Sequence, residues 1–286
     1  MGTISFGCEW IGLFVPKIAV CVHLVYSMPF LATLTLVSYS PALVSLCSLV
    51  SPLSSVVQND AVATAFAEAR RKFLPTFDAD APEPHMVYTA RDIAGDDVWR
   101  HVSRTTDACI HKDDFLGALT GVGDWTDVAQ TLLSIVQLDA PNVKNQIKAA
   151  ILLNYALLFQ QKKREHHRGS LSFIAGEIGL PKFVTERFLD LFMTYVDGSD
   201  RKAKYTTSKL DKDRLQVHIL LLYVMAHGRS MKVGTIQPVV EAMRIGQSTA
   251  ATLLREAGCT VQKQGGSYSV ALKVPLTFPP PRRGRN

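Results

Sequence analysis

Apolar and polar positions between residues 143 and 210 follow the spacing of helices and end in a short basic stretch. Three helices are predicted there: a long, strongly apolar one at 143–163, a short one at 170–179 and a third at 180–198. Ser170 stands where an N-cap is expected, Gly179 where the short helix should end, and Pro181 in the first turn of the third helix. The stretch "KAKYTTSKL" that follows is interpreted as a degenerate β-wing.

Residues 211–278 repeat this order of segments. The predicted helices lie at 211–228, 235–245 and 246–258, and the first of them is again long and apolar. Gln247 or Ser248 is expected to cap the third helix at its start, and Gly258 to end it.

A β-hairpin is predicted directly after the last helix. Apolar residues recur at every second position on both sides of Gly265 and Gly266, a pattern typical of a tight hairpin turn. The tip is expected to expose Lys263, Gln264 and Ser267. Three helices followed by a hairpin are the order of a winged helix, an elaborated helix-turn-helix. The sequence therefore predicts a mainly α fold with small β wings: winged helices at 143–210 and 211–278, then a basic Pro/Arg tail at 279–286.

Residues 60–142 are predicted to form an acidic linker with short helices. Its segment 73–99, called the strap below, is rich in proline and acids and has only short apolar anchors. The strap is expected to lie extended on another surface and to add no core. Asp96-Asp97 and Asp113-Asp114 stand beside expected helix starts, where carboxylates complement the helix dipole. We interpret them in that way and not as catalytic or metal-binding pairs.

The N-terminal segment 1–59 differs in character from the rest of the chain. Its only charged residues are Glu9 and Lys17, and prolines recur along it. Two interpretations stay open: a membrane-inserted segment, or non-coding sequence translated from a wrongly placed gene start.

Charge is divided unevenly along the chain. Residues 60–142 carry seven Lys/Arg against fourteen Asp/Glu, whereas residues 143–286 carry twenty-three against ten. The basic half predicts a polyanionic partner.

No catalytic, metal or cofactor site is predicted. The five cysteines are scattered without metal-ligand spacing, which fits a reducing compartment, and His166-His167 falls in a polar run expected to be a solvated loop. Gly121-Val122-Gly123 lacks the context of a dinucleotide-binding loop. We expect a protein without an active site or cofactor of its own.

Winged helices bind either nucleic acid or proteins, and the basic half favours DNA. The predicted third helices carry no array of Arg, Asn and Gln for reading bases, so we expect backbone contacts without sequence preference. The candidate DNA-binding residues are Lys162, Lys163, Arg164, Arg168, Lys182, Arg187, Arg201, Lys202, Lys204, Arg255, Lys263, Arg282, Arg283 and Arg285.

Several segments resemble one known family. They are "FLPTFDADAPEPHMVYTARDI", "ILLNYALLFQ", "HILLLYVMAHG", "LLREAGCTVQ" and "ALKVPLTFPPPRRGR", the most specific parts being "VYTARDI" and the ending from Gly258 to Leu276. Together they resemble the forty-nine-kilodalton subunit of RNA polymerase I, called in animals the polymerase-associated factor of fifty-three kilodaltons.

The resemblance implies a linker that lies along the polymerase core and a tandem winged-helix domain like one in TFIIE. It implies a nuclear, nucleolar subunit that contacts the polymerase core, binds DNA without sequence specificity and supports initiation and elongation on ribosomal RNA genes. In that family a β-barrel dimerisation module precedes the linker. Residues 1–59 are apolar instead, so pairing with the usual smaller subunit is not expected.

Two other functions remain open from the residues alone. One is a membrane-anchored interaction module that uses residues 11–58 as its anchor, although we do not expect a membrane partner. The other is a free-standing DNA-binding regulator, which would prefer one DNA sequence.

Overall fold

The computed structural model describes residues 68, 72–121, 123–138, 140, 142–196 and 204–279, together with 14–15 and 18–19. The chain divides into two compact units, Met1–Gln58 and Asn59–Asn286. In the first unit, strands β1 (Phe14–Val15) and β2 (Ile18–Ala19) pair antiparallel. The other expectations for the N-terminal segment lie outside the described residues. In the part of the chain that is described, no helix combines the length and apolar character needed to cross a bilayer.

The first of two similar halves of the larger unit follows the order helix–strand–helix–helix–strand–strand. Its elements are α7 (Val143–Lys162), β3 (His166–Arg168), α8 (Leu171–Ile178), α9 (Lys182–Phe192), β4 (Thr194–Val196) and β5 (Lys204–Thr206). The strands form an antiparallel sheet in the order β3-β5-β4.

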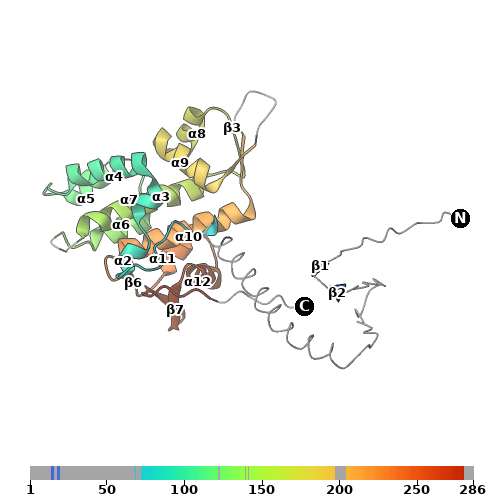
Figure 1. The fold of residues 1–286 in the computed structure, drawn as a ribbon. Helices are drawn as coiled ribbons and strands as arrows, with labels where there is room; N and C mark the ends of the chain where they lie inside the picture. The colour runs from blue at the N-terminus through green and yellow to red at the C-terminus, as the bar shows by residue number, and fades with distance from the viewer. Residues whose placement is uncertain are drawn as a thin grey trace. The chain divides into compact units, whose positions relative to one another are not determined.

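The second half has the same order of elements. They are α10 (Lys209–Ala226), β6 (Lys232–Val233), α11 (Gln237–Met243), α12 (Gln247–Glu256), β7 (Cys259–Gln264) and β8 (Ser267–Leu272). The sheet order is β6-β8-β7, again antiparallel. Both halves thus have the connectivity of a winged helix, and the predicted fold class, mainly α with small β wings, is confirmed (Figure 1).

Each wing contains a third strand that the sequence did not predict. The expectation of a solvated loop at His166-His167 was wrong, because these residues form β3 and His167 is only 1% exposed. The ring of His167 accepts a hydrogen bond from the backbone N–H of Arg164 (Nε2 to N, 3.0 Å), which turns the chain from α7 into the sheet. The predicted third helix of the first half is shorter than expected, because Thr194–Val196 forms β4.

Helix ends follow local chemistry at most positions. Ser170 accepts a hydrogen bond from the backbone N–H of Phe173, and Gly179 ends α8 in the left-handed region, as predicted. The predicted cap at Gln247 or Ser248 was wrong: Gly246 occupies the N-cap of α12, and no side chain caps it.

The Gly265-Gly266 hairpin is confirmed. The two glycines have φ of +54° and +93°, the left-handed conformations that a tight two-residue hairpin turn requires. At its tip Lys263 and Gln264 are exposed, whereas Ser267 is half-buried and its hydroxyl lies 2.6 Å from that of Thr235.

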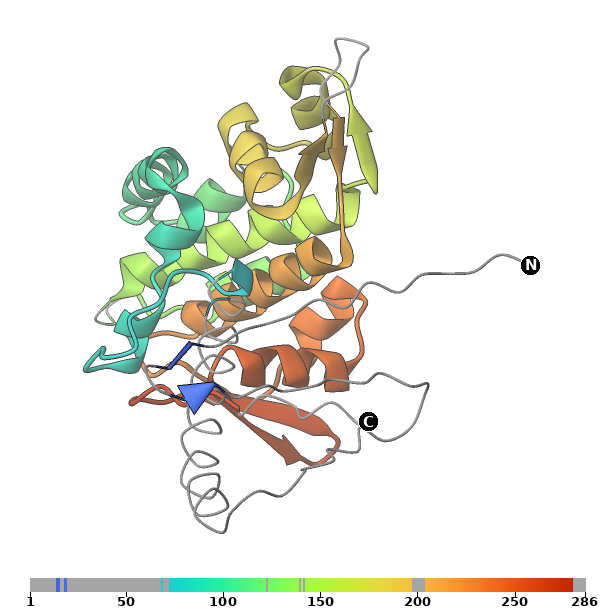
Figure 2. The same cartoon turned by 45° about the vertical axis from the view of Figure 1, so that its right-hand side comes forward.

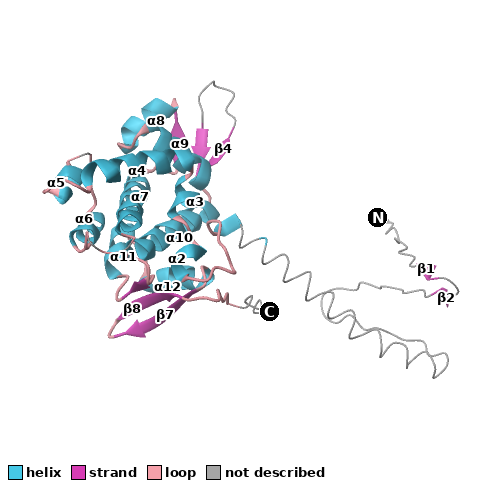
Figure 3. Cartoon of the chain, turned by 60° about the vertical axis from the view of Figure 1, so that its left-hand side comes forward, coloured by secondary structure: helices cyan, strands magenta, loops and turns pink. Residues whose placement is uncertain are grey.

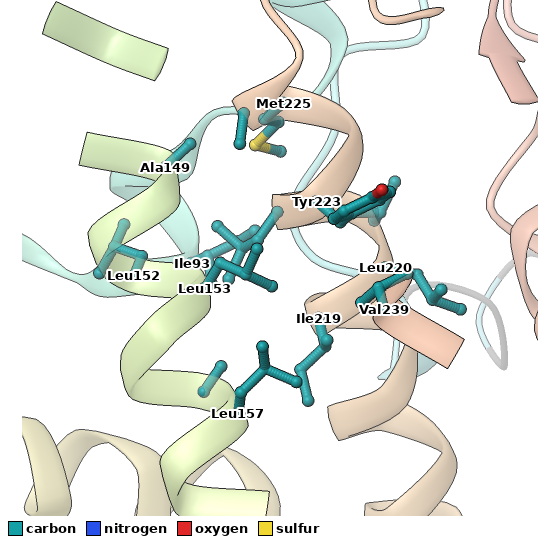
Figure 4. Close-up of a cluster of buried hydrophobic side chains, with 14 of the residues drawn as sticks. Ile93, Ala149, Leu152, Leu153, Leu157, Ile219, Leu220, Tyr223, Met225 and Val239 are labelled. Atoms are coloured by element: carbon teal, nitrogen blue, oxygen red, sulfur yellow. The ribbon is translucent and has the colours of Figure 1, made fainter. Parts of the chain in front are cut away.

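Helices α7 and α10 pack against each other at the centre and join the two winged helices. Both helices carry apolar side chains on nearly all sides, as is typical of helices that are surrounded by other helices. Figure 4 shows Leu153 and Leu157 of α7 on the side that faces Ile219 of α10, with Ile93 of the linker in the same cluster.

The described part of the linker places these helices on this core: α2 (Pro84–Val87), α3 (Ala90–Ala94), α4 (Asp96–Cys109), α5 (Phe115–Thr120) and α6 (Asp127–Ser134). Asp96 and Asp97 open the first turn of α4, and Asp114 caps α5 by accepting a hydrogen bond from the backbone N–H of Gly117 at 2.8 Å. The structural interpretation of the paired carboxylates is therefore confirmed.

The expectation that the strap adds no core was wrong. Val87 and Tyr88 are each 1% exposed, and the hydroxyl of Tyr88 donates a hydrogen bond to the carbonyl oxygen of Ala257 at 2.8 Å. Phe77 packs edge-on against Phe278, with ring centroids 5.3 Å apart. The strap supplies core side chains because the apolar surfaces of α7 and α10 extend beyond the winged helices themselves.

Candidate nucleic-acid interface

The candidate cations do not form one continuous surface. Arg201, Lys202, Arg282, Arg283 and Arg285 lie outside the described residues. The other candidates fall on two separate regions, because α7 and α10 hold the two wings at opposite ends of the unit (Figures 1 and 3). One region surrounds β3 and α9, and the other combines α12 with the β7–β8 hairpin.

Three candidates near the end of α7 are either paired with an acid of the chain or withdrawn from solvent. Lys162 Nζ lies 2.9 Å from Asp124 Oδ2, and an Arg164 Nη atom lies 2.9 Å from a Glu177 carboxylate oxygen. Lys163 is half-buried, and this burial lowers the pKa of its ammonium group to about 8.

The third helix of the first winged helix is covered in part by the linker. Arg187 of α9 donates a hydrogen bond to the carbonyl oxygen of Asp92 at 3.3 Å. The Phe183 ring packs edge-on against His101 of α4, with centroids 5.0 Å apart. Only Lys182, at the start of α9, is an exposed cation on this helix.

The first wing retains one exposed candidate cation whose side chain is described. Arg168 of β3 stands directly opposite Lys204 of β5 in the antiparallel register. Arg168 is exposed and makes no ion pair with the described part of the chain. Two positions for basic residues thus meet on neighbouring strands.

The third helix of the second winged helix is open by comparison. α12 packs chiefly on α10, α11 and the wing strands of its own half, and Figure 2 shows the β7–β8 hairpin against it. Its positions 248, 252 and 255 recur at helical spacing. Ser248 and Arg255 are exposed, and Thr252 is half-buried.

Basic side chains flank this open helix on both sides. Lys263 is exposed on the hairpin, and Arg244 is exposed in the tight turn between α11 and α12, where its φ is +54°. Neither makes an ion pair with described residues. Sequence reasoning missed Arg244. Its position between two predicted helices, just ahead of the third, was the signal that could have identified it.

Part of the positive charge is neutralised within the chain. Glu83 binds Arg229 through two oxygens, at 2.8 Å to Nε and 2.6 Å to Nη2, and Asp107 Oδ1 lies 2.8 Å from Lys144 Nζ. Each pair joins an acid of the linker to a cation of the basic half. The acidic linker therefore neutralises part of the basic half, and an excess of cations remains there.

The described residues hold no cluster of three or more His, Cys, Asp or Glu that could bind a metal ion. Cys109 and Cys259 are buried free thiols, and burial raises the pKa of the Cys259 thiol to about 12. The Cys259 thiol therefore stays protonated, and both cysteines serve as core side chains.

The connectivity and the packing define a tandem winged-helix protein with a helical linker built into its core. The chain matches the family of A49-like RNA polymerase I associated factors over residues 51–279, and it belongs to that family. The predicted family is thereby confirmed, and the protein is a factor associated with RNA polymerase I in transcription. Among curated proteins, none matches the chain.

Proposed function

We propose that this protein is a non-catalytic subunit of DNA-directed RNA polymerase I that binds DNA without sequence preference. In this role it supports initiation and elongation on ribosomal RNA genes in the nucleolus. The membership of the A49-like family supports the association with the polymerase. The open face of α12, with basic side chains on both flanks, supports the contact with DNA.

The α12 face suits phosphates better than base edges. It presents hydroxyl and guanidinium donors from Ser248, Thr249 and Arg255, and all three are exposed. Hydroxyls and isolated cations position a protein on a DNA backbone, whereas base reading needs several bidentate side chains on one helix. We therefore assign Arg244, Arg255 and Lys263 to backbone contacts.

The first wing is the second proposed contact. Arg168 and Lys204 lie opposite each other there, and Arg201 and Lys202 belong to the segment between its two last strands. Lys182 and the tail arginines 282, 283 and 285 are further proposed contacts. Lys162, Arg164 and Arg187 are assigned instead to holding the fold, because each already binds a group of the protein.

We propose polymerase I core subunits as the protein partners, with no cofactor and no active site in this chain. The other functions predict different results. A membrane-anchored module would fractionate with membranes instead of nucleoli. A free-standing regulator would select one DNA sequence, and a protein-docking module would show no salt-dependent DNA binding.

Removal of charge from the α12 region tests the proposal. The double variant Arg255→Gln, Lys263→Gln of the full chain is titrated with several unrelated short duplexes at a series of salt concentrations. Loss of two phosphate contacts should reduce the slope of log affinity against log salt by about 2, equally for all duplexes.

The matched control is Arg104→Gln, Lys112→Gln, which removes the same charge from exposed positions on the linker. It should leave the slope close to that of the unmodified chain. An equal effect of both double variants would mean that the α12 region is not a contact surface and that only net charge matters.

A further inference from the structure

A small polar pocket lies where the strap, the first winged helix and the second winged helix meet. Its walls come from residues 72–76, which precede α2, and from α3, α9 and α10. The three helices lie close together in Figure 3. The cavity measures about 260 Å³. It is distinct from the α12 face, and DNA binding there does not depend on it.

Two arginines face this pocket without a carboxylate partner among the described residues. Arg187 uses one N–H on the carbonyl oxygen of Asp92, at 3.3 Å, and Arg214 uses one on the carbonyl oxygen of Leu191, at 3.0 Å. The Nε atom of each guanidinium is buried and has no hydrogen-bond acceptor. These buried Nε atoms are closed to a partner, but a guanidinium has five N–H donors, so its other N–H groups remain for an acceptor supplied from outside.

The charge around the pocket is positive. Lys72 joins the two arginines in its lining, and Asp92 is the one acidic residue that lines it within the described chain. The side chain of Asp92 forms no ion pair with any of these cations in the described residues, although its carbonyl is bound to Arg187. The pocket therefore has an unmet preference for an anion.

Apolar side chains and a buried histidine complete the lining. Leu74, Pro75 and Ile93 line one side, and His218, which is 4% exposed, lies at the bottom. Nδ1 of His218 lies 2.7 Å from the carbonyl oxygen of Arg214, so this ring nitrogen carries the proton and is already used. The anion must therefore be held by the arginines.

We propose that this pocket binds the carboxylate of an aspartate or glutamate side chain presented by a partner protein. The planar fork of a guanidinium matches a carboxylate, and the aliphatic stem of the acidic residue would lie on the apolar walls. A phosphate of duplex DNA is less suitable, because it is carried on a broad double helix and the pocket is recessed between three segments of the chain.

Because the pocket joins the linker to both winged helices, an acidic segment bound there would fix their arrangement. Gly95 supports this role of Arg187. Its φ is +77°, and a Cβ atom at this position would come within 3.1 Å of Arg187 Nε, so the linker backbone lies directly against the guanidinium.

The test follows the arginine Nε–Hε signals of the full chain by NMR. Four probes are added separately: the blocked peptide acetyl-Leu-Glu-Leu-amide, its Gln analogue, inorganic phosphate and a short DNA duplex. The Glu peptide should shift the Arg187 and Arg214 signals along a saturating curve, with a Kd of about 1 mM, and the Gln peptide should not.

Arg214→Gln should weaken binding of the Glu peptide by about tenfold or more, whereas Lys112→Gln on the linker should leave it unchanged. Arg214→Lys keeps the charge without the fork and should also weaken binding, so the test does not depend on one variant that could fail to fold. The proposal is overturned if no probe shifts the two signals, or if phosphate or DNA shifts them and the Glu peptide does not. Failure of DNA binding at α12 would instead appear only in the salt slope.

Discussion

The buried His218 should make the stability of the fold depend on pH in a defined way. Burial lowers the pKa of this histidine from 6.5 to about 4, and its ring packs edge-on against Phe192. The folded protein thus keeps His218 neutral, while the unfolded chain takes up a proton once the pH falls below about 6.5. The stability from this group is complete above that pH and is lost as the pH falls toward 4.

The size of the effect follows from the two pKa values. Between about pH 7.5 and pH 4.5, the free energy of unfolding should fall by about 2–3 kcal/mol because of His218 alone. Urea unfolding of the full chain at a series of pH values gives the total dependence. The same series on His218→Asn, which keeps a donor near the Arg214 carbonyl, gives the dependence without this group.

The difference between the two pH profiles isolates His218 from other groups that titrate in this range. His101, His167 and His227 also have pKa values lowered by burial, and their contributions cancel in the difference. His166→Asn, at an exposed position on β3, is the matched control for loss of a histidine. Profiles of wild type and His218→Asn that run parallel within about 0.5 kcal/mol would refute the reasoning.

Three further predictions concern buried positions in the linker, in the second wing and at the end of α7. Tyr88→Phe removes the buried hydrogen bond to Ala257 and should lower the free energy of unfolding, measured in urea, by about 1–3 kcal/mol. The control Tyr195→Phe changes a side chain that is 57% exposed and should alter this free energy by less than about 0.5 kcal/mol. Gly258→Ala should cost about 2 kcal/mol in the same assay, because φ is +80° and the new Cβ would lie 2.7 Å from Leu276; an unchanged midpoint would contradict this geometry. Lys163 should react with an amine-specific acylating reagent more slowly than the exposed Lys112, because its Nζ atom is buried, although the same burial lowers its pKa to about 8; a faster reaction at Lys163 in mass-spectrometric mapping would oppose this.

The elements with strong local signals were predictable from the sequence. The hairpin at Gly265-Gly266 follows from alternation of apolar residues on both sides of two glycines, and the ends of α8 follow from Ser170 and Gly179. In each case the cause lies within a few residues of the element, so the pattern alone is sufficient.

The unpredicted elements depend on contacts between distant segments. β3 and β6 are three and two residues long, too short for any periodic signal, and they exist because β5 and β8 pair with them. The start of α10 was missed for a different reason. Ser208 and Asp211 form a capping box there, but the basic run before them obscured it.

The candidate DNA-binding residues show the same division between what a local pattern predicts and what depends on contacts between distant segments. Composition indicated a basic half, but it could not separate free cations from those that bind the linker. Lys162 and Arg187 are adjacent to Asp124 and Asp92 only after folding, across many residues of chain. The pocket between Arg187 and Arg214 was likewise invisible, because its two arginines come from different winged helices.

The linker has a practical consequence for experiments on this protein. Tyr88, Ile93, Val98 and Val102 belong to the same buried cluster as α7 and α10. A fragment that begins at residue 140 would expose the surfaces they cover. DNA binding is therefore best measured on the full chain.

The central claim is that the protein binds the DNA backbone without choosing a sequence. Its most direct test is the affinity of the full chain for several unrelated duplexes of equal length, measured between about 0.05 and 0.3 M salt. We predict a steep linear fall of log affinity with log salt and nearly equal affinities for all duplexes. A strong preference for one duplex, or an affinity that does not change with salt, would contradict the claim.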